Sequence, residues 1–140
     1  MSAETVAKSM GHHAHWGFSS GFDFVDAVIK AREGKECGSP GVPINILLIQ
    51  PGDIRHILYT ISRRRRHIEK FGGSLPQINF YLLETQIETV TRDLLLLQIL
   101  TDYEVPIRQR ANIYLEVFGN NKVQRRTSEY IDNVGKQLKM

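Results

Sequence analysis

The chain has 140 residues, of which 41% are hydrophobic and 24% are charged. A chain of this length buries roughly 70% of the surface that its unfolded form exposes, which is enough for one hydrophobic core. A single cysteine, Cys37, excludes a disulfide framework within the chain and favours a reducing compartment. No apolar run reaches the roughly 20 residues that cross a bilayer, and residues 1–10 lack the apolar core of a secretory signal. These features predict a cytoplasmic protein with no membrane partner.

The positive charge of the chain is concentrated at one place. The net charge is +3, and four of the 18 basic residues are consecutive, Arg63–Arg66. Without this run the chain would be slightly negative, so it lacks the broad basic face that nucleic-acid binding requires. We therefore predict no nucleic-acid partner, and an adaptor that binds nucleic acid through the arginine run stays open as an alternative.

The first part of the chain contains two segments without a regular pattern. Residues 1–18 are predicted to be a flexible tail, and a linker rich in glycine and proline is predicted near residues 33–43. Between them, Phe22–Arg32 has apolar residues at helical spacing and is predicted to be a helix. Ile44–Ile49 follows the linker and is apolar at both odd and even positions, which is typical of a parallel strand covered on both faces.

A turn and a helix follow this strand. Pro51 and Gly52 interrupt the apolar pattern, and Asp53 is a typical N-cap residue, worth about 1 kcal/mol. Apolar residues then recur at one face of a helix, which the arginine run is expected to close. The members of this stripe are Ile54, Ile57, Leu58 and Ile61.

The remaining segments complete an α/β pattern. Ile78–Leu83 is predicted to be a second strand, and three helices are predicted from Thr85 to Leu100, from Pro106 to Gly119, and from Ser128 to Leu138. Strand, helix and strand in this order predict a Rossmann-like βαβ core with parallel strands and several additional helices. Two strands alone leave unpaired edges, so other segments, a partner or a longer domain should complete the sheet.

The ends of the two strands form the candidate binding site, because ligands of such folds lie at the carboxyl ends of the strands. Gly52 allows close approach to a ligand, the helix start at Asp53 offers N–H groups, and Glu84 stands where adenosyl-binding folds place an acid for ribose hydroxyls. We therefore predict Gly52, Asp53 and Glu84 as candidate cofactor-binding residues for a nucleoside ligand such as S-adenosylmethionine. Because Pro51 lacks an N–H and Asp53 repels phosphate, a dinucleotide is not expected. A capped helix start with no ligand explains the same residues.

Other reactive residues do not form a recognisable set. His12, His13 and His15 have no nearby cysteine or carboxylate to complete a zinc site, so no metal is predicted. Cys37 has no neighbouring histidine to activate it. No catalytic triad or pair of carboxylates stands out, and no catalytic residue is predicted.

Six short segments occur together, in the same order and with similar gaps, in one known family. They are His15–Ser19, Leu47–Ile49, Asp53–Leu58, Asn79–Glu84, Arg92–Leu96 and Tyr114–Asn120. Through them the chain resembles the dynein axonemal assembly factor 3 family. Because the members of that family are several times longer, the resemblance implies that residues 19–140 are the amino-terminal part of a Rossmann-like α/β domain of methyltransferase type.

The resemblance also implies a function. Members of the family act in the cytoplasm during the pre-assembly of axonemal dynein arms for motile cilia and flagella. This chain would then be a non-catalytic scaffold or chaperone-associated adaptor without a cofactor, and its partners would be axonemal dynein chains, other assembly factors and chaperones. An S-adenosylmethionine-dependent methyltransferase, or a protein that binds S-adenosylmethionine, is the alternative. Gln50-Pro51-Gly52 stands where the family has a glycine directly after the strand, which weakens the expectation of a cofactor.

Overall fold

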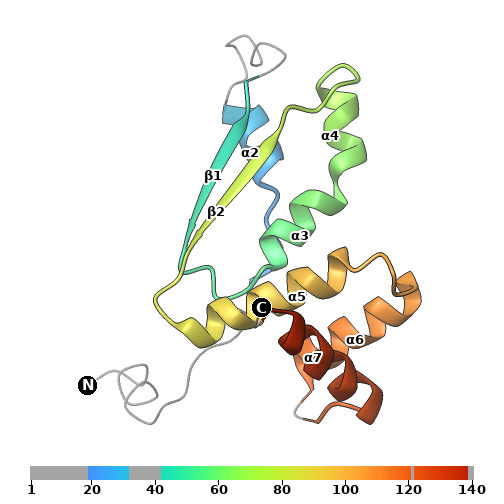
Figure 1. Cartoon of the computed structure of the whole chain (residues 1–140). Coiled ribbons are helices and arrows are strands. Elements are labelled where there is room, and N and C mark those ends of the chain that lie inside the picture. Colours follow the sequence, from blue (N-terminus) through green and yellow to red (C-terminus); the bar gives the residue numbers. More distant parts are fainter. Residues whose placement is uncertain (1–18, 32–41, 121, 139–140) are drawn as a thin grey trace. The chain divides into compact units, whose positions relative to one another are not determined.

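The computed structural model describes residues 19–31, 42–120 and 122–138. It divides the chain into two compact units, Met1–Val90 and Thr91–Met140. The described part of the first unit has strands and helices, whereas that of the second is helical (Figure 1). The predicted tail and most of the predicted linker lie outside the described residues. The proposal that residues 19–140 belong to one larger Rossmann-like domain stays a prediction.

Two parallel strands form the sheet of the first unit. β1 (Ile44–Ile49) and β2 (Ile78–Leu83) pair in register, from Ile44 beside Ile78 to Ile49 beside Leu83. Parallel strands need a crossover connection, and two consecutive helices, α3 (Arg55–Ser62) and α4 (Arg64–Lys70), supply it. The positions of both predicted strands and their common direction are therefore confirmed.

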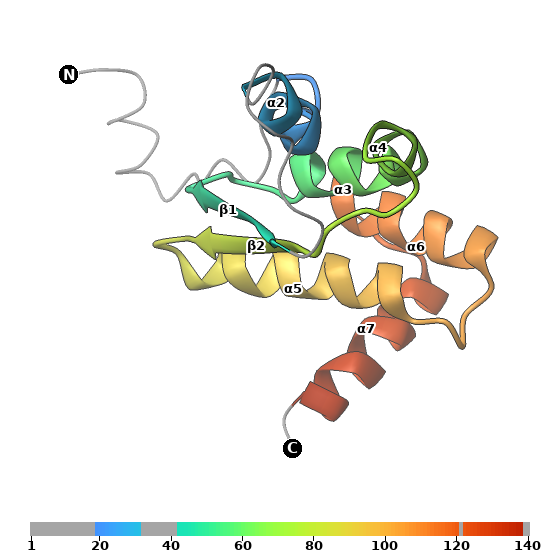
Figure 2. The same cartoon turned by 90° about the horizontal axis from the view of Figure 1, so that it is seen from above.

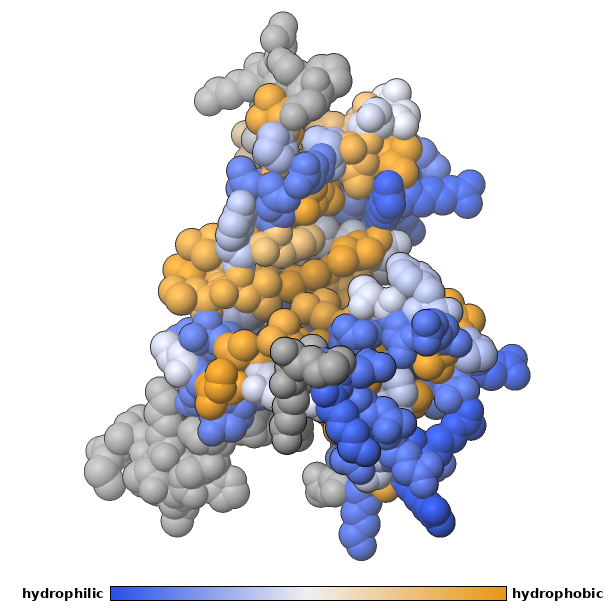
Figure 3. Space-filling model, in the orientation of Figure 1, coloured by the Kyte–Doolittle hydropathy of each residue, from blue (hydrophilic) through white to orange (hydrophobic). Residues whose placement is uncertain are grey.

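One face of this sheet is covered and the other is open. α2 (Phe24–Ala31), α3 and α4 lie on the covered face (Figure 2), where Ile44, Ile46 and Leu48 are buried. On the other face, apolar side chains gather at the surface (Figure 3), and those of Leu47, Ile49, Tyr81 and Leu83 are each more than half exposed. The prediction that both faces of the sheet are covered is wrong. An apolar run in the sequence does not specify on which faces of the sheet helices pack.

The helical crossover differs from the prediction at both ends. α3 begins at Arg55 rather than directly after Asp53, and the Asp53 carboxylate accepts a hydrogen bond from the Arg55 N–H at 2.9 Å. The arginine run does not close the helical segment. Arg63 forms a junction, and α4 continues to Lys70 before Gly72 and Gly73 end it with φ values of 70° and 105°. Such positive φ values are accessible to glycine at little cost.

The core face of α3 is rotated relative to the predicted stripe. Ile54 and Ile57 are buried as expected, but the side chain of Ile61 is 51% exposed and that of Thr60 is fully buried. Thr60 turns inward because its hydroxyl bonds to the backbone of the segment before α2, an interaction that the spacing of apolar residues cannot reveal.

Three helices follow β2. α5 (Ile87–Thr101) begins in the first unit and continues into the second, which also contains α6 (Ile107–Gly119) and α7 (Arg125–Leu138). α6 follows Pro106 and ends at Gly119, as predicted, whereas α7 begins before the predicted Ser128. None of the described helices is long and apolar enough to cross a membrane.

Candidate functional site

The carboxyl ends of β1 and β2 are joined by hydrogen bonds between their turns. The backbone N–H of Gln50 donates to the carbonyl of Leu83 at 2.8 Å, which extends the sheet by one step. Gln50 then adopts a φ of 49°, in the left-handed region that non-glycine residues seldom occupy. Its side-chain amide donates to the hydroxyl of Thr85 at 3.3 Å. The turn after β1 is therefore tied to the turn after β2.

Gly52 and Glu84, two of the candidate cofactor-binding residues, contact each other at this edge. The N–H of Gly52 donates to Oε1 of Glu84 at 3.0 Å, and Gly52 has a φ of 74°. The acid predicted to bind ribose hydroxyls thus uses one carboxylate oxygen to hold the turn after β1. Both residues lie at the predicted edge of the sheet, and their hydrogen bond gives Glu84 a structural role that needs no ligand.

Asp53, the third candidate residue, lies beneath the same turn. Its side chain is almost fully buried, and Oδ1 lies 2.9 Å from the backbone nitrogen of Arg55 and 3.6 Å from Nε of Arg55. A carboxylate engaged in this way stabilises the start of α3. Whether Gly52, Asp53 and Glu84 bind a cofactor stays a prediction.

Arg55 and His56 attach α3 to the segment before α2. A guanidinium nitrogen of Arg55 donates to the hydroxyl of Ser19 at 3.1 Å, and Nδ1 of His56 accepts the backbone N–H of Phe22 at 3.0 Å. The neutral imidazole with an accepting Nδ1 carries its proton on Nε2. Nε of Arg55 lies 3.5 Å from Nε2 of His56. Because both nitrogens carry a proton, this contact is not a hydrogen bond.

The surroundings of His56 favour its neutral form. Burial lowers the pKa of His56 below its usual value of 6.5, and the positive charge of Arg55 lowers it further, against a smaller opposite effect of Asp53. A neutral imidazole is the form that accepts the N–H of Phe22. The electrostatics and the hydrogen bond at His56 therefore agree.

Two buried polar residues that the sequence did not single out complete this contact. The hydroxyl of Thr60 accepts the N–H of Phe24 at 3.2 Å and donates to the carbonyl of His56 at 2.8 Å. Nε2 of His67, almost fully buried on α4, lies 2.9 Å from the Asp23 carboxylate. A polar residue on the core side of a helix was the only available signal, because the partners lie 36 to 44 positions away.

A partly exposed acid, Asp26, links α2 to α4 in the same region. The Asp26 carboxylate bonds to Lys70 and forms an ion pair with Lys30 at 2.9 Å. The hydrogen bonds from Lys70 and Lys30 lower the pKa of Asp26 to about 2. This group holds the two helices together through charge, at the surface rather than in the core.

In the helical unit, Arg92 and Phe118 connect two of the segments through which the chain resembles a known family. A guanidinium nitrogen of Arg92 donates to the carbonyl of Phe118 at 3.0 Å, and the guanidinium carbon lies 5.1 Å from the centre of the Phe118 ring. Phe118 in turn stacks on Tyr114 with a centroid distance of 5.7 Å. These family-like residues therefore fix α6 against α5.

Taken together, the residues that carry the resemblance make contacts within the chain. Arg55, His56 and Glu84 hold turns and helices of the first unit, and Arg92 and Phe118 hold helices of the second. In the described residues no group of three histidine, cysteine, aspartate or glutamate side chains is arranged to hold a metal ion. His12, His13, His15 and Cys37 lie outside them. The contacts of these family-like residues therefore stabilise the fold within each unit.

Comparison with known proteins identifies the family to which this chain belongs. The model of the family described as a domain of unknown function, DUF4470, matches residues 15–123. Because this match covers most of the sequence, the chain belongs to that family. No solved structure matches the chain significantly.

Similarity to curated proteins extends over almost the whole chain. The chain is 33% identical over 129 residues to a dynein axonemal assembly factor 3 homolog of Chlamydomonas reinhardtii. The matched region covers 90% of this chain and 18% of that protein. The chain is 28% identical to dynein axonemal assembly factor 3 of Xenopus laevis, over 92% of this chain and 26% of that protein. It is 29% identical to dynein axonemal assembly factor 3 of Danio rerio, over 99% of this chain and 27% of that protein. The chain thus spans about a fifth to a quarter of these relatives.

Proposed function

We propose that this chain acts in the cytoplasm as a non-catalytic scaffold or adaptor during the assembly of axonemal dynein. The observation that carries the proposal is its similarity, over nine-tenths of its length or more, to three relatives named as dynein axonemal assembly factor 3. The partners proposed on this basis are axonemal dynein chains, other assembly factors and chaperones.

The geometry of the family-like residues supports a role in binding rather than in catalysis. Glu84 bonds to Gly52, His56 accepts the N–H of Phe22, and Arg92 bonds to the carbonyl of Phe118. Residues that would be the first candidates for acid, base or electrophile in an enzyme therefore already have partners inside the chain. Such contacts give the described units a defined surface, which a scaffold or adaptor requires.

The strand arrangement supports the proposed Rossmann-like core. Two parallel strands joined through α3 and α4 are one βαβ unit, and within the described part of the chain no further strand pairs with the outer edge of β1 or β2. Parallel sheets of this kind usually have more strands and helices on both faces. A Rossmann-like domain of methyltransferase type would extend the sheet at these edges and cover the open apolar face.

Affinity capture from ciliated cells tests the proposed function. The full chain, immobilised and incubated with cytoplasm from cells that are regrowing cilia, should enrich axonemal dynein heavy or intermediate chains over cytoplasm from cells without motile cilia. Loss of the gene should also reduce the number of dynein arms seen in axonemes by electron microscopy. Absence of dynein chains from the captured material, together with normal dynein arms after gene loss, would reject the proposal.

Binding of S-adenosylmethionine is the second candidate function, and one observation favours it. The N–H of Gly52 and the carboxylate of Glu84 lie 3.0 Å apart at the carboxyl ends of both strands, where Rossmann-like folds bind nucleosides. Titration calorimetry of the full chain with S-adenosylmethionine decides the point. Sub-millimolar binding that Glu84→Ala abolishes supports this function, whereas the same binding by the variant, or none by either protein, argues against it.

A further inference from the structure

A cleft lined by both polar and apolar side chains lies between α6 and α7 in the helical unit. Its volume is about 620 Å³, within the roughly 300–1,000 Å³ that ligand sites occupy. Its walls combine two arginines, Arg108 and Arg126, with four side-chain amides, and the exposed side chain of Leu115 also lines it. The amides belong to Gln109, Asn112, Asn120 and Gln124. The cleft therefore offers charge, hydrogen-bonding groups and apolar surface, to which Pro106 and Ile113 also contribute.

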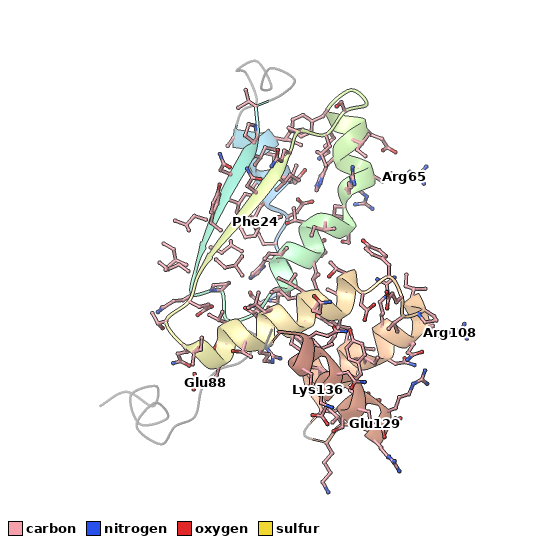
Figure 4. The ribbon with its side chains drawn as sticks, in the orientation of Figure 1. Phe24, Arg65, Glu88, Arg108, Glu129 and Lys136 are labelled. Carbon is pink, nitrogen blue, oxygen red and sulfur yellow. The ribbon has the colours of Figure 1, made fainter. Side chains whose placement is uncertain are left out.

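The two arginines of the cleft are not neutralised by the chain. Among the described residues, neither Arg108 nor Arg126 has an ion pair or a side-chain hydrogen bond, and Arg108 projects outward from α6 (Figure 4). The neighbouring Arg125, by contrast, pairs with Glu129 at 2.8 Å. The first turns of α6 and α7 also contain no acidic residue. The positive charge at this cleft is thus available to a partner.

The acid that lines the cleft is already engaged. Oε2 of Glu116 accepts the backbone N–H of Gln124 at 3.1 Å, and Glu116 thereby fixes the chain just before α7. Two arginines face this single carboxylate among the lining residues, so the cleft keeps an excess of positive charge. Arginine is the residue best suited to bind carboxylates, through paired N–H groups in a planar fork.

The remaining lining residues distinguish a peptide from a nucleic acid. Each side-chain amide has both a donor and an acceptor, which match the N–H and carbonyl groups of an extended peptide. None of the residues lining the cleft is aromatic, so it lacks the stacking surface on which proteins bind unpaired bases. The exposed fraction of Leu115, 64%, provides a contact for an apolar side chain.

We propose that the cleft between α6 and α7 binds an acidic peptide segment of a partner protein, with carboxylates on Arg108 and Arg126 and an apolar side chain on Leu115. The inference goes beyond the proposed function, because it names a surface and the chemistry of its ligand. It does not depend on the role of this chain in dynein assembly. The exposed arginines of α4, including Arg65, are not part of this site.

A direct binding measurement tests the proposal. The probe is a short fluorescein-labelled peptide that alternates glutamate and leucine, titrated with the full chain and followed by fluorescence anisotropy. The chain should bind this peptide with an affinity that falls as salt is added, and should bind a lysine–leucine peptide of the same length much more weakly. Arg108→Gln and Arg126→Gln should each weaken binding roughly tenfold, the usual effect of losing one charged hydrogen bond.

Arg125→Gln is the matched control, because it removes the same charge from the residue next to Arg126 while sparing the cleft. It should leave the affinity for the acidic peptide within about twofold of that of the unmodified chain. Leu115→Ser should weaken binding without altering the helical circular dichroism. The proposal is overturned if the double arginine variant, folded by circular dichroism, binds as well as the unmodified chain, if Arg125→Gln weakens binding as much, or if a single-stranded RNA binds these arginines more tightly than the peptide.

Discussion

The two units of the chain are stabilised by different kinds of contact. In the α/β unit, buried polar side chains join segments that are far apart in the sequence, as Thr60 does with Phe24 and His67 with Asp23. In the helical unit, arginines lie over aromatic rings near the surface, Arg92 over Phe118 and Arg110 over Tyr103, each 5.1 Å from the ring centre. The first unit also has such a contact, Arg63 over Tyr59 at 4.7 Å, so its distinguishing feature is the pair of buried bonds between distant segments.

This difference indicates that polar side chains serve different roles in the two units. In the first unit, the buried side chains of Thr60 and His67 support the fold, because each bonds to a residue far along the chain. The helical unit leaves Arg108, Arg126 and several amides facing a cleft, where they do not contribute to the fold. Substitutions in the first unit should therefore change stability, and substitutions in the cleft should change binding.

The largest expected effect is on the core of the α/β unit. Ile54→Ala removes a fully buried side chain and should lower the free energy of unfolding by about 2–5 kcal/mol. Ile61→Ala, in α3 and with a side chain that is 51% exposed, should cost well under half as much. Urea unfolding followed by circular dichroism measures both. Equal losses for the two variants would show that the core face of α3 is the one predicted from the apolar stripe.

The next effect concerns the buried hydrogen bonds of the same unit. Thr60→Val keeps the shape of the side chain but leaves the N–H of Phe24 without its acceptor, so it should cost about 1–3 kcal/mol. Thr101→Val, where the exposed hydroxyl bonds only within its own helix, is the control and should change stability by less than about 0.5 kcal/mol. Hydrogen exchange of the β1 and β2 amides should increase in the first variant alone.

A smaller effect is expected in the helical unit, where the hydroxyl of Tyr130 donates to the Asp102 carboxylate at 2.8 Å. Burial and the Asp102 carboxylate raise the pKa of Tyr130 to about 12. The stabilisation by this group is complete below the unfolded pKa of 10 and is lost as the pH rises towards 12. Tyr130→Phe should cost about 0.5–1.5 kcal/mol at neutral pH and should reduce the loss of stability in alkali.

The exposed Tyr103 supplies the control for this measurement. Tyr103→Phe keeps the ring beneath Arg110 and should leave both the neutral stability and its dependence on alkali unchanged. If the two variants respond to pH in the same way, the bond between Tyr130 and Asp102 does not stabilise the unit.

The smallest effect is the acid response of His56 in the α/β unit. Because the folded pKa of His56 is below 6.5, its contribution to stability is complete above pH 6.5 and is lost as the pH falls through the folded pKa. His56→Asn keeps an acceptor for the N–H of Phe22 but cannot take up a proton, so it should flatten the dependence of the unfolding free energy on pH below 6.5. An unchanged acid dependence in this variant would show that His56 is not the responsible group.

The sequence predicted the local structure of this chain well. Two segments, Ile44–Ile49 and Ile78–Leu83, were recognisable as strands. Both are short, and all of their residues are apolar except for one asparagine in each. Pro106 and Gly119 marked the ends of a helix because proline favours a first turn and glycine a helix end. The order of these elements was enough to predict a parallel βαβ unit. That Gly52 and Glu84 lie at the same edge of the sheet followed from it, because the carboxyl ends of parallel strands meet there, but their direct hydrogen bond was not predicted.

The tertiary structure decided which of these residues face inward and which of them have partners. The burial of Thr60 and His67, the exposure of Ile61, and the open face of the sheet depend on segments packed from distant parts of the chain. The cleft likewise exists only in the folded unit, because its two arginines come from different helices, α6 and α7. Hydrophobic spacing reports the period of an element, but a hydrogen bond between residues 36 or 44 positions apart has no signature in that period.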